Sequence, residues 1–151
     1  MRRMRVAASL LFVALPCMAA DSTHPFKNSK GKMIDLPWWE TMASCYGRFH
    51  ALSQYAAETN ADAAKKLGDY STIALNLAVK RLTAERGLSV EEAQKVVLPN
   101  AQQAAQITTQ GFAIYKMTGE VDKKNNQLMD ECFADFNDYN KDFPGELNTS
   151  Q

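Results

Sequence analysis

Four carboxylate side chains recur near the C-terminal end of the chain at a spacing that places them on one face of a helix. They follow one another at steps of four, three and four residues: Glu131, Asp135, Asp138 and Asp142. Such a stripe could steer a partner protein or hold a cation weakly, and the alternative is an ordinary solvated helix face. Because acids late in a helix meet the negative end of its dipole, we expect neighbouring lysines such as Lys141 to compensate.

Two adjacent tryptophans, Trp38 and Trp39, form a second candidate contact site. Neighbouring residues of a helix point about 100° apart, so both side chains cannot enter the same apolar seam. One can close the end of a helical bundle while the other stays more exposed and offers contact area to a partner. The alternative is that the preceding segment folds back and covers it.

Metal and haem chemistry have little support in the two histidines, His24 and His50. Neither has a cysteine, histidine or carboxylate at the helical spacing of a zinc or di-iron site. His50 and Met129 would lie at the same depth on neighbouring helices, which leaves open a haem held between them. A methionine in an apolar seam usually belongs to the core, so we expect no cofactor.

Enzyme motifs are absent from the sequence. There is no GxSxG nucleophile turn, no glycine-rich phosphate loop, no CxxC redox pair and no CxxCH haem attachment. Catalytic groups can converge from distant positions, but these absences favour a protein that is not an enzyme.

Residues 1–20 have the pattern of a secretory signal peptide. A start with three arginines precedes the uncharged run 6–15, and small residues follow. The run is shorter than the roughly 20 apolar residues that span a bilayer. We therefore expect a periplasmic or secreted protein whose mature part has no transmembrane segment.

Charge is balanced in the whole chain, with 17 basic and 17 acidic residues. Removal of the predicted leader and its three arginines leaves 14 basic against 17 acidic residues, a net charge of −3. Both export and this negative charge oppose nucleic-acid binding.

Helical periodicity dominates the rest of the chain. It predicts four helices, with ends uncertain by a few residues, over 37–58, 61–86, 89–118 and 120–142. Ser89 and Glu92 fit a capping box, and Gly87 and Gly119 fit helix stops. Pro99 predicts a kink in the third helix or its division into two collinear pieces. Apolar seams run along the first and last helices: Trp38, Met42, Cys45, Phe49, Leu52 and Ala56, then Met129, Cys132, Phe136, Tyr139 and Phe143.

Short links between helices favour antiparallel neighbours, so we predict an all-α, up-down-up-down four-helix bundle over residues 37–143. Residues 21–36 contain three lysines with serine, asparagine and glycine between them, and we expect a flexible basic arm. Residues 144–151 follow the last helix and are predicted to fray.

Two cysteines remain after the leader is removed, Cys45 and Cys132. In an oxidising compartment two cysteines of a small domain usually pair. Both lie on apolar seams and at similar depths in an antiparallel first and last helix, so a disulfide can join them. The bridge would contribute about 4–5 kcal/mol by the chain-entropy model.

The sequence thus predicts an exported, non-enzymatic helical bundle that binds another exported or envelope protein. Inhibitors, immunity factors, chaperones and envelope accessory proteins belong to this class. The predicted contact residues are Trp38, Trp39 and the four carboxylates of the stripe. The alternative is a periplasmic carrier that holds haem, a metal or an apolar molecule within the bundle.

Overall fold

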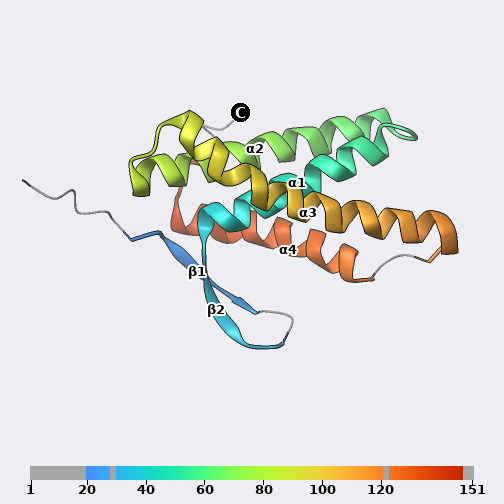
Figure 1. Cartoon of the computed structure of the whole chain (residues 1–151), viewed down its shortest axis with the longest axis horizontal. Coiled ribbons are helices and arrows are strands. Elements are labelled where there is room, and N and C mark those ends of the chain that lie inside the picture. Colours follow the sequence, from blue (N-terminus) through green and yellow to red (C-terminus); the bar gives the residue numbers. More distant parts are fainter. Residues whose placement is uncertain (1–19, 28–29, 121–122, 148–151) are drawn as a thin grey trace, which may run out of the picture.

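The computed structural model describes residues 20–27, 30–120 and 123–147 and is mostly helical (Figure 1). The predicted signal peptide lies outside the described residues apart from Ala20. The elements are β1 (Thr23–Lys27), β2 (Met33–Pro37), α1 (Trp38–Ala56), α2 (Ala61–Arg86), α3 (Val90–Thr118) and α4 (Lys123–Asp142). None of the described helices combines the length and the apolar character that a bilayer span requires.

The helix ends follow the predicted capping chemistry. The Asn60 side chain accepts a hydrogen bond from the Ala63 amide at the start of α2. Ser89 and Glu92 form both halves of the capping box of α3. Gly87 ends α2 and Gly119 ends α3, each with a positive φ that glycine adopts without strain. α3 continues through Pro99 as one helix, which excludes the second of the two predicted alternatives, a division into two collinear pieces.

The segment predicted as a flexible basic arm is instead a β-hairpin, which also makes the all-α prediction incomplete. Its antiparallel register pairs His24 with Leu36 and Phe26 with Ile34. These four side chains share one face and are buried or half-buried, while Pro25, Lys27, Met33 and Asp35 between and beside them are exposed. This alternation of buried and exposed side chains is typical of a β-strand. It is short, and the lysines, serine and glycine around it are typical of a linker.

α1 lies in the middle of the fold and contacts the other three helices (Figure 1). The Ser53 hydroxyl at its C-terminal half donates to the carbonyl of Ala64 at the start of α2. Phe49 packs against Phe133 of α4. The predicted seam of α1 is buried at Trp38, Met42, Cys45 and Phe49, which confirms that it faces the core.

α1 and α3 touch at Gly47, a contact that a square four-helix bundle does not have, because its first and third helices are diagonal. A Cβ atom placed on Gly47 would lie 1.9 Å from the carbonyl oxygen of Ala101. The two backbones are therefore as close as the missing side chain allows.

The two cysteines that the sequence paired lie at disulfide distance. The Sγ atoms of Cys45 and Cys132 are 2.09 Å apart and the Cα atoms 5.5 Å apart, across 87 residues of sequence. The bond ties α4 to the middle of the fold.

The tail predicted to fray is folded over the residues that the structure describes, 144–147. Glu146 accepts hydrogen bonds from Arg81 (2.6 Å) and from the Tyr139 hydroxyl (2.8 Å). Leu147 packs against the core. A buried guanidinium needs a carboxylate partner, and the tail supplies it. Residues 148–151 lie outside the described residues.

Replacement of Gly47 by alanine should open the α1–α3 contact. We expect Gly47→Ala to lower the free energy of unfolding by about 2–4 kcal/mol, because the backbone carbonyl at Ala101 cannot turn aside as a side chain would. Gly68→Ala in α2 is the matched control, since its Cβ would meet only the Ser53 hydroxyl at 3.5 Å. That control should stabilise the helix by up to about 1 kcal/mol. Urea unfolding of both variants checks the contrast, and equal effects would contradict it.

Removal of the disulfide should cost about 4–5 kcal/mol of stability by the chain-entropy model, because the cross-link closes a long loop in the unfolded chain. Reductant should lower the melting temperature of the unmodified protein to near that of the double variant Cys45→Ser and Cys132→Ser. The same reductant should leave the double variant unchanged. A melting temperature that responds to neither treatment would show that the two sulfurs are not bonded.

Candidate functional site

The hairpin covers Trp38. The His24 ring stacks on the Trp38 indole with 4.0 Å between ring centres. Trp38 is only 1% exposed, and its indole N–H donates to an Asp142 carboxylate oxygen at 2.9 Å. One carboxylate of the predicted stripe therefore holds a core side chain.

Trp39 is also buried, at 8% exposure, so the prediction of an exposed tryptophan for partner contact is wrong. Its indole N–H donates to Asp21 at 3.2 Å, and the Arg86 guanidinium lies over its ring. Arg86 also donates to Asp21 and thereby lowers the pKa of that carboxyl. The segment before α1 thus supplies the acceptor for the indole nitrogen of Trp39, and α2 supplies the cation over its ring.

His24 belongs to β1, and its side chain packs between the hairpin and α1. The sequence assigned it no role. Its Nε2 atom is 2.7 Å from the Thr41 hydroxyl. Burial lowers the pKa of His24, and the carboxylates of Asp138 and Asp142 act against that shift. A histidine beside a hydroxyl is a familiar catalytic pairing, but both of these side chains are buried.

The carboxylate stripe on α4 is divided by its surroundings. Asp138 and Asp142 are exposed, whereas Glu131 and Asp135 are partly buried. Asp138 pairs with Lys141 at 2.6 Å, which confirms the prediction that Lys141 compensates the acidic residues near the end of the helix. Only part of the stripe is therefore available to a partner as free negative charge.

A small cleft lies where α1, α4 and the hairpin meet, with a volume of about 80 Å³. Its walls include the apolar Phe26 and Leu36 and the charged Arg48 and Asp135. The Nη1 atom of Arg48 is buried and has no hydrogen-bond partner among the described residues. Burial, together with the negative charges of Glu131 and Asp138, raises the pKa of Asp135 to about 7 against the opposing effect of Arg48.

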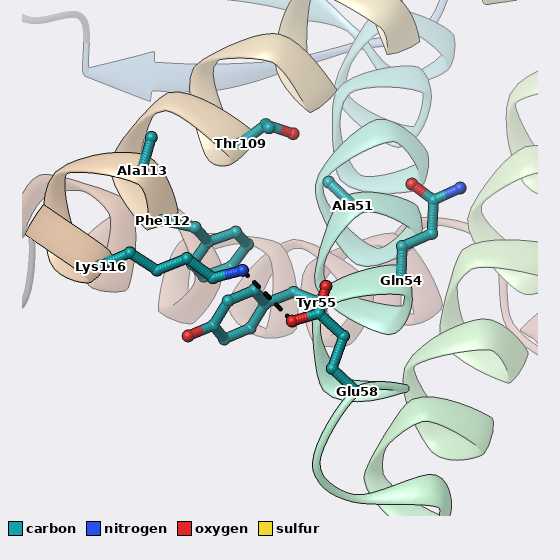
Figure 2. Close-up of a pocket in the computed structure, with 8 residues that line it drawn as sticks. All are labelled: Ala51, Gln54, Tyr55, Glu58, Thr109, Phe112, Ala113 and Lys116. Carbon is teal, nitrogen blue, oxygen red and sulfur yellow. Dashed lines mark hydrogen bonds and ion pairs between the residues drawn. The ribbon is translucent and has the colours of Figure 1, made fainter.

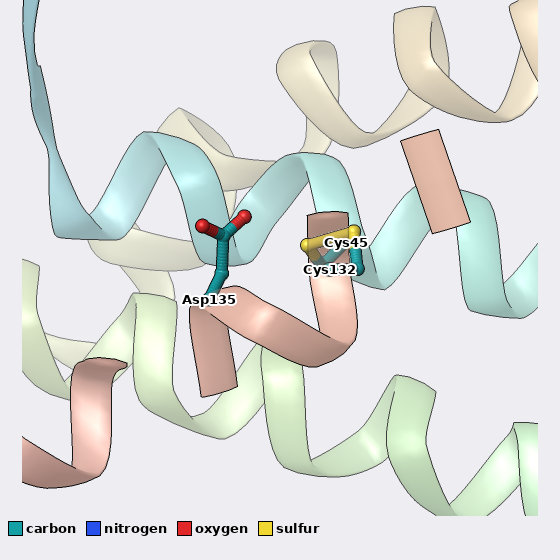
Figure 3. A group of neighbouring side chains, drawn as sticks. All are labelled: Cys45, Cys132 and Asp135. Atoms are coloured by element: carbon teal, nitrogen blue, oxygen red, sulfur yellow. A yellow bond between two sulfur atoms is a disulfide. The ribbon is translucent and has the colours of Figure 1, made fainter. Parts of the chain in front are cut away.

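Asp135 lies next to the two cysteine sulfurs (Figure 3). A carboxylate oxygen and the two Sγ atoms are all within 4.8 Å of one another, which is the spacing of metal ligands. Sulfur binds a metal as thiolate, however, and each of these sulfurs is already bonded to the other. The group therefore does not form a metal centre while the disulfide is closed.

His50 and Met129, the two residues that the sequence allowed as ligands of a haem, do not face each other in the core. His50 is exposed on α1, where its Nε2 lies 3.1 Å from the amide nitrogen of Gln54. Met129 is partly buried and packs against the apolar core. An exposed histidine beside a core methionine gives no site for haem between the helices.

An open pocket of about 260 Å³ lies between the C-terminal half of α1 and α3 (Figure 2). The rings of Tyr55 and Phe112 stack inside it with 4.2 Å between centres. Lys116 lies above the Tyr55 ring and pairs with Glu58 at 3.2 Å. The sequence did not indicate this pocket, because Tyr55 and Phe112 meet only through the unforeseen α1–α3 contact.

Comparison of the chain with known protein families, with curated proteins and with solved structures finds no match.

Asp135 should destabilise the protein as pH rises. Its pKa of about 7 in the folded state lies above the ordinary value of 3.8, so the folded state favours the protonated carboxyl. The contribution of Asp135 to the free energy of unfolding is therefore complete below about pH 4 and is lost as pH rises through 7. Asp135→Asn should raise the free energy of unfolding by on the order of 1–2 kcal/mol at pH 8, a figure reduced to allow for the remaining solvent contact of the carboxyl group. It should gain little at pH 4.

Asp138→Asn is the matched control, because Asp138 is exposed and no comparable gain at high pH is expected. Urea unfolding from pH 4 to pH 8 measures the difference. Parallel stability profiles for the unmodified protein and Asp135→Asn would show that Asp135 ionises as it does in water.

Proposed function

We propose that this chain is an exported, non-enzymatic helical-bundle protein that acts by binding another exported or envelope protein. The observation that carries the proposal is the pocket between α1 and α3. It is open to solvent, has an aromatic floor and an ion pair at its edge, and its size suits one inserted side chain. Cavities that enclose a whole small-molecule ligand are commonly larger, about 300–1,000 Å³.

A pocket of this kind is a typical anchor site for a protein partner. Binding energy at interfaces concentrates where an apolar or aromatic side chain enters a desolvated pocket with a polar rim. Tyr55 and Phe112 provide the apolar floor, and Glu58 and Lys116 provide charges of both signs beside it. An aromatic or long aliphatic side chain with a polar end is the occupant that this lining favours.

The carboxylate stripe of α4 supplies electrostatic steering in this proposal, chiefly through Asp142, because Lys141 pairs with Asp138. The predicted leader and the cysteine pair at disulfide distance support a place outside the cytosol. The proposal keeps the up-down-up-down order of the helices, although the contact of α1 with α3 departs from a square bundle. A carrier function draws less support, because His50 is exposed and the central seam is filled by packed side chains.

Filling the pocket should abolish partner binding without unfolding the protein. Thr109 is exposed on α3 and lines the pocket, so Thr109→Arg should place a long side chain across the opening. We expect at least a tenfold lower recovery of the partner from an envelope extract, measured by quantitative mass spectrometry against bait amount. A tenfold loss corresponds to about 1.4 kcal/mol of binding energy.

Thr72→Arg in α2 is the matched control. Thr72 is also exposed, and its hydroxyl bonds to the carbonyl four residues earlier, as that of Thr109 does. It should retain the partner at the level of the unmodified bait. If both variants capture the same proteins in the same amounts, the pocket is not the binding site.

A further inference from the structure

α3 has an uncharged surface of unusual length for an exposed helix. From Val96 to Tyr115 it has no charged residue, although 23% of the chain is charged. Glutamine, threonine, alanine and isoleucine make up most of its exposed positions there. Depletion of charge with retained apolar side chains is typical of the centre of a protein interface.

A seam of exposed residues runs along this uncharged surface of α3. Its members follow one another at steps of four, three, four and three residues, and all are exposed: Gln103, Ile107, Gln110, Ile114 and Met117. Ile107, Ile114 and Met117 are 41%, 46% and 80% exposed. This is the spacing of the inward positions of a two-helix coiled coil.

The seam is centred away from the buried face of α3 and from the Tyr55–Phe112 ring stack, and it borders the pocket only at Ala113. At about 100° per residue, its centre lies about 120° round the helix from the buried face that includes Val97, Ala101 and Thr108. Phe112, which lines the pocket, lies on the other side of that buried face. A helix packed on the seam would therefore leave the Tyr55–Phe112 pocket open.

We propose that two copies of this chain pack their α3 helices antiparallel along this seam, about a two-fold axis at Gln110. In that register Ile107 faces Ile114 of the second copy, and Gln103 faces Met117 of the second copy. The two Gln110 amides meet at the axis, where each can both donate and accept a hydrogen bond.

The charge distribution favours a second copy over an unrelated partner. In a two-fold contact each surface meets itself, so a charged residue near the axis would face its own like charge. The seam avoids this penalty by having no charge between Lys95 and Lys116. A partner of opposite charge would be recognised by charged groups, which this face does not offer.

The same argument selects the antiparallel direction. Parallel helices in register would set Glu92 beside Glu92 and Lys95 beside Lys95 at the edge of the seam. In the antiparallel register, positions 92 and 95 lie beyond the end of α3 of the second copy at Thr118, so these like charges do not meet. One helix pair buries less than a standard interface, so the dimer should be weak and dependent on concentration.

Sedimentation equilibrium of the purified protein between about 5 and 500 μM tests self-association, since this range brackets micromolar dissociation constants. We expect a monomer–dimer equilibrium whose dissociation constant rises at least tenfold in the double variant Ile107→Glu and Ile114→Glu, because burying unpaired carboxylates is costly. Val90→Glu is the control, an exposed apolar residue of the same helix outside the seam. Circular dichroism confirms that the variants are folded.

Cysteine cross-linking under a mild oxidant tests the direction of packing. Gln110→Cys should form an interchain disulfide, because position 110 of each copy lies at the axis. Gln103→Cys should not, because in the antiparallel register its counterpart is about 20 Å away along the helix. A monomer at all concentrations, a dimer that persists in the double glutamate variant, or equal cross-linking at both positions would overturn the proposal. Thr109→Arg should leave the dimer intact, which separates this result from failure of the pocket to bind a partner.

Discussion

The close approach of α1 and α3 at Gly47 is the contact on which the arrangement of the molecule depends. A Cβ atom at Gly47 would overlap the carbonyl of Ala101, so the two backbones can meet only because that atom is missing. The contact gives α1 a third helical neighbour in addition to α2 and α4. It also brings Tyr55 and Phe112 together farther along the same two helices, and their stacking forms the floor of the pocket.

A second constraint comes from the polar groups that this compact fold buries. The indole nitrogens of Trp38 and Trp39 need acceptors, and they find them in Asp142 and Asp21. The partly buried Arg81 finds Glu146 in the same way. These hydrogen bonds help to hold the segments before α1 and after α4 on the helices, because each spares a polar group of the interior the cost of being left unpaired.

The parts of this structure that the sequence predicted are those encoded by local chemistry. Apolar spacing and caps such as Ser89 with Glu92 depend on neighbours within one turn, so the four helices could be located. The pairing of Cys45 with Cys132 followed because both lie on seams at similar depth. The hairpin was missed because its alternation is only a few residues long and its composition is that of a linker. The pocket was missed because it depends on the close approach of α1 and α3 at Gly47. A single glycine within a helix forms no periodic pattern from which such an approach could be predicted.

The pocket and the seam use different sides of α3, and this separation has a consequence for how the protein could work. The buried face of α3 binds α1, one flank lines the pocket beside Lys116, and the opposite flank presents Ile107 and Ile114. A dimer formed along the seam would carry two identical pockets on one rigid pair of helices. Two linked sites bind a partner that is itself repeated, or a surface that carries several copies of it, more tightly than one site can, without any additional contact at either site. Weak self-association is enough for this effect, because a partner that occupies both pockets also holds the two copies together.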